Sequence, residues 1–148
     1  MQLLLKIKKT QEYDDLPTPS YMTIGSAGMD LFAAIDKSIT LKTLERVTLP
    51  TGICIELPKG YEAQIRPRSG LASKHGITLL NSPGTIDWDY RGEIKIILIN
   101  LSTEEFTINK GDRVAQMVIN KIVIPIIEIV EEVTDTMRGS SGFGSTGV

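Results

Sequence analysis

The sequence is poor in the residues on which several kinds of protein chemistry depend. Its 148 residues include one cysteine, Cys54, and one histidine, His75. A single cysteine excludes an internal disulfide and suits a reducing compartment. With one residue of each type, we expect neither a zinc cluster nor a Ser-His-Asp or Cys-His catalytic arrangement. Hydrolytic chemistry in this chain would therefore depend on carboxylates, hydroxyls and arginines, with Mg²⁺ as a candidate cofactor.

Long apolar runs and a strong charge imbalance are also missing. No stretch approaches the roughly 18 uninterrupted apolar residues of a membrane-spanning helix. The N-terminal MQLLLKIKK lacks the charge order and cleavage site of a signal peptide. The net charge is −2, so phosphate binding would depend on a local cluster of basic residues. There is no basic, aromatic face for nucleic acid. We expect a cytoplasmic protein that binds neither membrane nor nucleic acid.

What is present reads mostly as short strands. Strand patterns recur about every 8–12 residues, which is typical of an all-β sandwich or barrel. We expect strands at residues 3–9, 45–50, 52–58, 61–67, 93–100, 105–124 (with a turn at 110–112) and 124–133. One short helix is expected over residues 69–76, with Ser69 as its N-cap and Gly76 at its end. The prediction is a single all-β domain over residues 1–148.

The last twelve residues, 137–148, differ in composition from this body. They are rich in glycine and hydroxyl residues and have no apolar periodicity. The segment carries a single arginine, Arg138, and a single aromatic ring, Phe143. We predict a flexible C-terminal arm.

A candidate phosphate site begins the expected helix. Arg68, Ser69 and Gly70 adjoin one another in the segment RPRSGLA. A helix N-terminus exposes free N–H groups and a partial positive charge. The arginine and serine add donors, and the glycine permits close approach, so the segment suits a phosphate. The alternative is an ordinary capped helix beside two surface arginines.

The segment NSPGTIDWDYRGE, residues 81–93, predicts a β-hairpin. Asn81, Ser82, Pro83 and Gly84 are turn formers. A hairpin that opens into a pocket offers main-chain groups that can recognise the edge of a nucleobase. Asp87 within it is a candidate functional carboxylate, and the alternative is backbone bonding in an Asx-type turn.

An acidic residue lies among small and apolar residues in the segment SAGMDLFAA. This residue, Asp30, needs a partner if it is buried there. Either a salt bridge or a metal or water ligand would meet that need.

Five segments occur in one order along the chain: AGMDLFAA, RPRSGLA, NSPGTIDWDYRGE, GDRVAQMV and RGSSGFGSTG. They span residues 27–147 and closely resemble the motifs of the trimeric dUTPase family, in order and in spacing. The resemblance implies a jelly-roll-like β-barrel that assembles as a homotrimer, with three active sites shared between subunits. It also implies Mg²⁺-dependent hydrolysis of dUTP to dUMP and pyrophosphate, which keeps uracil out of DNA and supplies dUMP for thymidylate synthesis.

The resemblance also implies roles for individual residues. Asp87 matches the carboxylate that activates the attacking water, and Tyr90 matches the ring that packs under deoxyribose. The matched substrate contacts are Asn81, Gly84, Thr85, Ile86 and Lys95 at the uracil, Arg68, Ser69 and Gly70 at the phosphates, and Gln116 from a neighbouring chain. Asp30 matches the acidic residue that helps hold Mg²⁺, through water.

The arm of the family closes over the bound nucleotide, which would explain the composition of residues 137–148. By match, Phe143 would stack on uracil and Arg138 would pair with the γ-phosphate. Gly144, Ser145 and Thr146 would wrap and hydrogen-bond the triphosphate. Trp88 departs from the small residue common between the two aspartates of this hairpin.

Two other functions compete with dUTP hydrolysis. A related barrel acting on dCTP, as a deaminase or a bifunctional deaminase–diphosphatase, would share the fold and the phosphate site. The uracil-type hairpin and the arm with Phe143 disfavour it. A nucleotide-gated binding module would use hydrolysis only to reset a partner contact, and the chain has no extra domain or insertion that supports this role.

Overall fold

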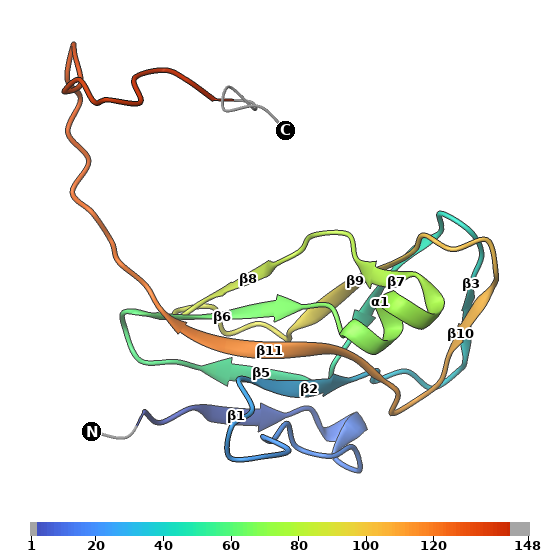
Figure 1. The fold of residues 1–148 in the computed structure, drawn as a ribbon. Helices are drawn as coiled ribbons and strands as arrows, with labels where there is room; N and C mark the ends of the chain where they lie inside the picture. The colour runs from blue at the N-terminus through green and yellow to red at the C-terminus, as the bar shows by residue number, and fades with distance from the viewer. Residues whose placement is uncertain (1–2, 143–148) are drawn as a thin grey trace.

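The computed structural model describes residues 3–142, and within them the chain is mostly β with one α-helix (Figure 1). The strands are β1 Lys6–Lys9, β2 Gly28–Phe32, β3 Ile39–Leu41, β4 Arg46–Pro50, β5 Ile53–Glu56, β6 Tyr61–Arg66, β7 Ile77–Leu79, β8 Gly84–Asp87, β9 Lys95–Asn100, β10 Phe106–Ile108 and β11 Arg113–Lys121. A 3-10 turn, η1 Gln11–Tyr13, and the helix α1 Ser69–His75 complete the elements. No helix in this part of the chain has the length and apolar character needed to cross a bilayer.

Two sheets enclose the hydrophobic core. One has the strand order β2-β11-β6-β8 and the other β4-β9-β7, and all their pairings are antiparallel. Strand residues alternate between the two faces of a sheet, so Met117, Ile65, Ile96 and Leu98 point inward and are at most 2% exposed. The alternate positions on the first sheet carry polar groups outward. This outer face carries the candidate site residues Asp30, Thr85, Asp87 and Gln116.

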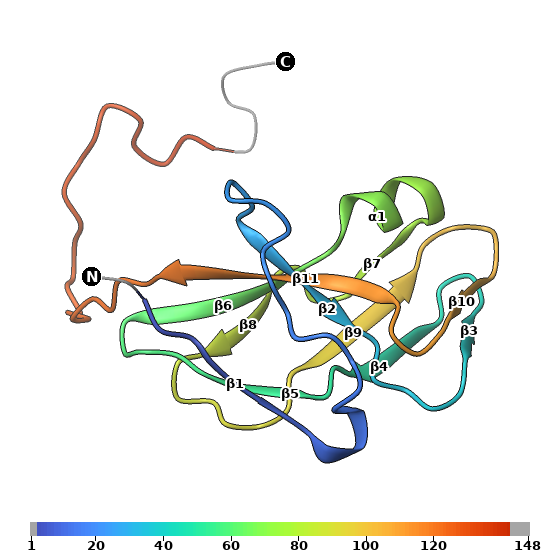
Figure 2. The same ribbon diagram turned by 90° about the horizontal axis from the view of Figure 1, so that it is seen from below.

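Two smaller sheets lie at the margins. Strand β1 lies along the bottom of the molecule in Figure 1 and pairs with β5, and the β10-β3 pair lies at the end nearest α1 (Figure 2). The four sheets of residues 3–142 are hydrogen-bonded separately and do not close into one barrel. The all-β prediction with one short helix is thus confirmed, whereas the described part of the chain does not form the closed barrel that was expected.

The hairpin predicted over residues 81–93 does not form a hydrogen-bonded strand pair. β8 pairs with β6, whereas β9 lies between β4 and β7 in the other sheet. The turn itself is present, because the Tyr90 N–H donates to the Asp87 carbonyl at 3.1 Å. The segment therefore connects the two sheets. Strand β9 belongs to the second sheet, where its apolar residues are buried on the core side.

The helix is close to its predicted position. Gly76 ends it with φ of 62°, and its N–H bonds to the Ala72 carbonyl. The N-cap prediction is wrong by one residue, because Ser69 is already helical and Arg68 holds the cap position without a side-chain cap bond. The Arg68 side chain is instead bonded elsewhere, as described below.

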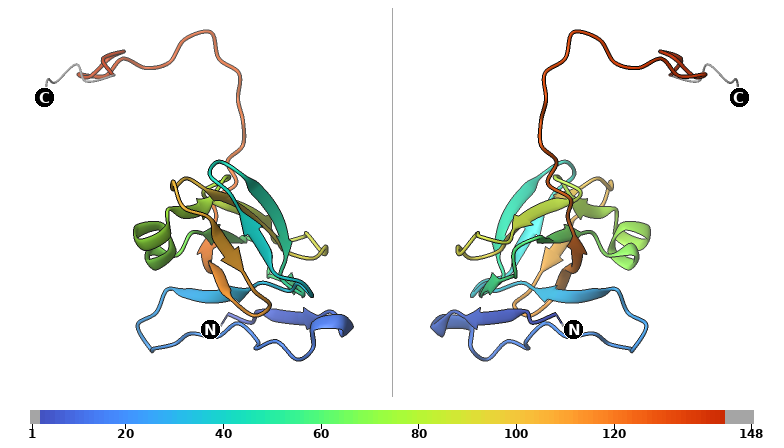
Figure 3. Two further views of the ribbon diagram at one scale, coloured as in Figure 1. Left: turned by 90° about the vertical axis from the view of Figure 1, so that its right-hand side faces the viewer. Right: turned by 90° about the vertical axis from the view of Figure 1, so that its left-hand side faces the viewer.

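The segment after β11 leaves the body and extends away from it (Figure 3). The strand predicted over residues 124–133 is wrong: these residues form no regular structure. A strand needs a neighbour to satisfy its backbone groups, and none of the strands within residues 3–142 pairs with this segment. Its apolar side chains are consequently in solvent, with Ile126, Ile127 and Ile129 exposed to 99%, 87% and 97%.

Candidate functional site

A polar cavity of about 270 Å³ opens where β8 turns toward β9. We call it the β8 cavity. It is lined by Asn81, Thr85, Ile86, Asp87, Tyr90, Glu93 and Lys95. All except Glu93 were singled out from the sequence. The fold thus brings together the residues matched to base and sugar recognition with the proposed catalytic carboxylate.

Strand β8 places Asp87 at the rim of this cavity. β8 runs antiparallel to β6, with Glu62 directly opposite Asp87. Asp87 is the last residue of the strand and its side chain is exposed, so solvent reaches its carboxylate. Glu62 is engaged separately, because its Oε1 accepts a hydrogen bond from the Gln64 Nε2 at 2.8 Å.

Tyr90 has a defined position although it is 44% exposed. Its hydroxyl donates to the Glu93 carbonyl at 3.1 Å. Trp88 does not line the β8 cavity and instead packs against the hydrophobic core. The large side chain of Trp88 therefore lies outside the β8 cavity.

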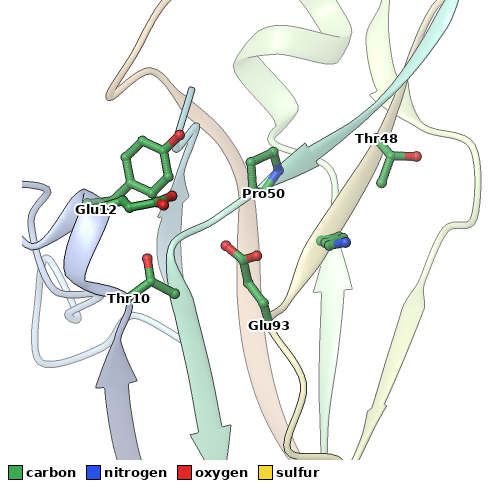
Figure 4. A pocket seen from close by; sticks show the side chains of 7 residues that line it. Thr10, Glu12, Thr48, Pro50 and Glu93 are labelled. Atoms are coloured by element: carbon green, nitrogen blue, oxygen red, sulfur yellow. The ribbon is translucent and has the colours of Figure 1, made fainter. Parts of the chain in front are cut away.

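Glu93 lies at the boundary between the β8 cavity and a second cavity. This Thr10 cavity measures about 420 Å³ and is lined by Thr10, Glu12, Tyr13, Thr48, Pro50, Glu93 and Lys95 (Figure 4). The Glu93 side chain extends toward the chain after Pro50, where its Oε1 accepts the Gly52 N–H at 2.8 Å. Burial raises the pKa of the Tyr13 phenol, and the nearby carboxylates of Asp36 and Glu12 raise it further. Glu93 therefore anchors the segment before β9 to the turn between β4 and β5 of the same chain.

A second group of candidate residues lies around the loop before α1. Arg68 Nε is 2.9 Å from Asp30 Oδ1, and its Nη1 donates to the Arg113 carbonyl at 3.1 Å. Arg113 Nη1 lies 3.4 Å from Asp30 Oδ2. The salt-bridge interpretation of Asp30 is thus confirmed. Sequence reasoning missed Arg113, although it lies in the same segment GDRVAQM as Gln116 and Asp30 needed a cationic partner.

Gln116 joins this group from the middle of the sheet. It is opposite Asp30 on β2 and opposite Arg66 on β6. Its Nε2 donates to the Pro67 carbonyl at 3.0 Å, so it braces the loop that carries Arg68. Arg68, Gln116 and Asp30 therefore form one network, next to Ser69 and Gly70 at the start of α1.

The two groups are not brought together within one chain. Asp30 is on β2 and Asp87 is on β8, at opposite edges of the four-stranded sheet. Three strand spacings of about 4.8 Å separate them sideways, roughly 14 Å before any offset along the strands. A single chain therefore holds the base pocket and the arginine network at different places.

The candidate arm residues are only partly within the described structure. Arg138 is exposed, and its Nε donates to the Ser141 carbonyl at 2.9 Å. Phe143, Gly144, Ser145 and Thr146 lie outside the described residues. The arm thus makes no contact with the β8 cavity through residues 137–142.

Residues 3–142 contain no group of three or more His, Cys, Asp or Glu side chains suited to a metal ion. Asp30 is the matched metal residue, and both of its oxygens already face arginines. Mg²⁺ is commonly held by one or two carboxylates together with water and substrate phosphates. An ion beside Asp30 would have to share its oxygens with Arg68 and Arg113, so water and substrate phosphates would have to supply its other ligands.

These features describe a small β-rich protein with a ligand-sized polar cavity and a separate arginine network. The sequence profile of the dUTPase family matches residues 14–147. The chain is 58% identical over 148 residues to a deoxyuridine 5'-triphosphate nucleotidohydrolase of Caldanaerobacter subterraneus subsp. tengcongensis, covering all of both chains. It is 60% identical over 144 residues to the protein of that name from Rickettsia felis, covering 97% of each.

A solved structure has the same fold. The Staphylococcus bacteriophage 80alpha dUTPase with dUpNHpp superposes with a TM-score of 0.87 at 28% identity, over 98% of this chain and 99% of the phage chain. This protein belongs to the dUTPase family.

Proposed function

We propose that this protein hydrolyses dUTP to dUMP and pyrophosphate with Mg²⁺. The observation that carries the proposal is the β8 cavity, because it collects a carboxylate, an aromatic ring, an amide and exposed main-chain groups in a dUTPase-family chain. Its proposed role in the cell is to keep uracil out of DNA and to supply dUMP for thymidylate synthesis.

Each group of the β8 cavity has a proposed task. Asn81 and the backbone of residues 84–87, with Lys95 on the returning strand, recognise the uracil edge through donors and acceptors at fixed spacing. Tyr90 packs under the deoxyribose and leaves no room for a ribose 2'-hydroxyl. Asp87 accepts a proton from the water that attacks the α-phosphorus, and pyrophosphate leaves from the opposite side.

The triphosphate requires positive charge beside this pocket. Arg68, with the Ser69 hydroxyl and the Gly70 backbone, would bind its oxygens, and Gln116 would add a contact. Bound Mg²⁺ would offset phosphate charge in the transition state. Arg68 reaches the phosphates already oriented, because Asp30 and the Arg113 carbonyl hold two of its nitrogens.

We propose that the complete site forms between chains of a homotrimer. The separation of Asp87 from Asp30 and its partner Arg68 within one chain supports this assembly. So does the exposed apolar segment at residues 123–133, since a fully buried isoleucine contributes about 1.5–3 kcal/mol. Ile126→Asp should weaken the trimer in light scattering after size exclusion, while Glu131→Gln in the same segment should not.

The arm completes the proposed cycle. Arg138 and Phe143 would reach a bound nucleotide, and Gly144, Ser145 and Thr146 would follow the triphosphate closely. Closure excludes bulk water and strengthens the charge interactions around the phosphates.

Product analysis tests the proposed function directly. The protein is incubated with Mg²⁺ and, in separate reactions, with dUTP, UTP, dTTP and dCTP, and the products are separated by ion-exchange chromatography. Conversion of dUTP alone to dUMP and pyrophosphate is expected. Consumption of dCTP would instead indicate the related deaminase-type activity, and binding of dUTP without turnover would favour a nucleotide-gated module.

A further inference from the structure

We propose that Gly92 is a specificity-determining position, because the side chain it lacks leaves the space in which the Tyr90 ring lies. The inference rests on the proposed function, in which that ring selects deoxyribose. Gly92 contributes no group to the β8 cavity, so its effect would pass entirely through Tyr90.

The space above Gly92 is already filled. A Cβ added there would lie 2.5 Å from Tyr90 Cζ and 2.9 Å from Cε2, and closer still to the phenolic oxygen. Real Cβ atoms essentially never make contacts below 3.0 Å. The φ of Gly92 is outside the left-handed region, so the backbone itself accepts any residue. Glycine is therefore needed here for room rather than for conformation.

The ring is held in this place by a hydrogen bond of its hydroxyl rather than by the core. The Tyr90 hydroxyl donates to the Glu93 carbonyl at 3.1 Å. Glu93 is in turn anchored, since its carboxylate accepts the Gly52 N–H at 2.8 Å. A ring that is 44% exposed has few packing contacts to resist displacement. A methyl group at position 92 would thus move the ring rather than the chain around it.

Two other side chains that we propose to contact the substrate also lie against a glycine. A Cβ at Gly28 would lie 3.3 Å from Gln116 Cδ and closer to its Oε1, and a Cβ at Gly84 would lie 3.2 Å from Asn81 Nδ2. Neither glycine has φ in the left-handed region. Three side chains proposed to touch the nucleotide therefore lie against glycines. Among the three, only Gly92 lies beneath the ring assigned to the sugar.

The experiment measures kcat/KM for dUTP and for UTP in Gly92→Ala, with two comparison variants. Gly25→Ala is the matched control, because it also has φ outside the left-handed region and nothing within 4 Å of an added Cβ. Gly28→Ala displaces Gln116 instead of Tyr90. Since a methyl-sized change in a pocket alters discrimination by about tenfold or more, the dUTP:UTP ratio should fall about tenfold in Gly92→Ala. It should stay unchanged in Gly25→Ala and Gly28→Ala.

A double-mutant cycle separates this role from a general structural one. In a Tyr90→Ala background, adding Gly92→Ala should leave the ratio unchanged, because the ring is already gone. If Gly92→Ala alone fails to fold in a thermal melt, the double variant should fold again. An unchanged ratio in Gly92→Ala, a fall that persists without Tyr90, or a double variant that still fails to fold would each overturn the proposal.

Failure of the proposed function is distinguishable from failure of this inference. If the unmodified protein does not hydrolyse dUTP, the function fails while the contact between Gly92 and Tyr90 is unaffected. The same variants are then compared by calorimetry for binding of dUMP and UMP. A preference for dUMP that falls in Gly92→Ala supports the inference, and an unaltered preference overturns it.

Discussion

Replacing Asp87 by asparagine should abolish most turnover while leaving the protein folded and able to bind nucleotide. Asp87 ends β8 at the rim of the β8 cavity, and its side chain is exposed. An isosteric change at an exposed position alters stability by no more than about 0.5 kcal/mol. Loss of a general base lowers a rate by about 10²–10⁴-fold, which corresponds to about 2.7–5.4 kcal/mol of transition-state stabilisation. The stability change is thus small beside the change in rate.

Continuous measurement of pyrophosphate release gives kcat, and calorimetry with dUpNHpp gives affinity separately from turnover. Asp89→Asn is the matched control, because Asp89 is exposed two residues further on and does not line the β8 cavity. Only Asp87→Asn should lose kcat, with an unchanged melting temperature in both variants. Near-normal turnover in Asp87→Asn, or an equal loss in Asp89→Asn, would refute the assignment of Asp87 as the base.

Three further predictions concern the arm, the core and pH. Truncation after Met137 should lower turnover of dUTP without dissociating the oligomer; full activity of the truncated protein would contradict closure by the arm. Asn100→Ala should lower the free energy of unfolding by about 3–4 kcal/mol in urea titrations, because the buried amide makes four hydrogen bonds that are worth about 1 kcal/mol each. Lys110 lowers the pKa of Asp15 by hydrogen bonding, and Asp15 raises that of Lys110 in return. A carboxyl group whose pKa is lowered by folding stabilises the fold at pH values above its ordinary pKa of 3.8, and this stabilisation is lost as pH falls through the lowered pKa. The urea midpoint of Asp15→Asn should therefore lie below that of the unmodified protein at pH 7, and the two midpoints should converge in acid. A difference that persists in acid would place its cause outside this ion pair.

Local pattern determined which segments could be strands. Apolar, β-branched runs such as residues 93–100 predicted β9, and one face of that strand is buried. Gly76 predicted the end of the helix because glycine readily adopts a positive φ, and its φ is 62°. Pattern could not decide pairing. Residues 81–93 had the composition of a hairpin, yet β8 pairs with β6 because long-range packing, rather than the turn, selects the neighbour.

The exposed segment after β11 illustrates the same limit from the other side. Residues 124–133 have strand composition, but composition supplies no partner strand. The short strands β3 and β7 have partner strands but were not predicted, since three residues are too few to establish an alternation.

The sequence by itself determined the family, because five motifs in order depend only on the covalent chain, and it selected the residues that we propose to carry the chemistry. Tertiary structure decided which of those residues meet. It paired Asp30 with Arg68 and Arg113, turned Trp88 toward the core, and held Asp30 and Asp87 apart at opposite edges of one sheet. It also placed Tyr90 over Gly92. The physical reason is that contacts across a sheet or a turn depend on register and packing, which no local run of residues specifies.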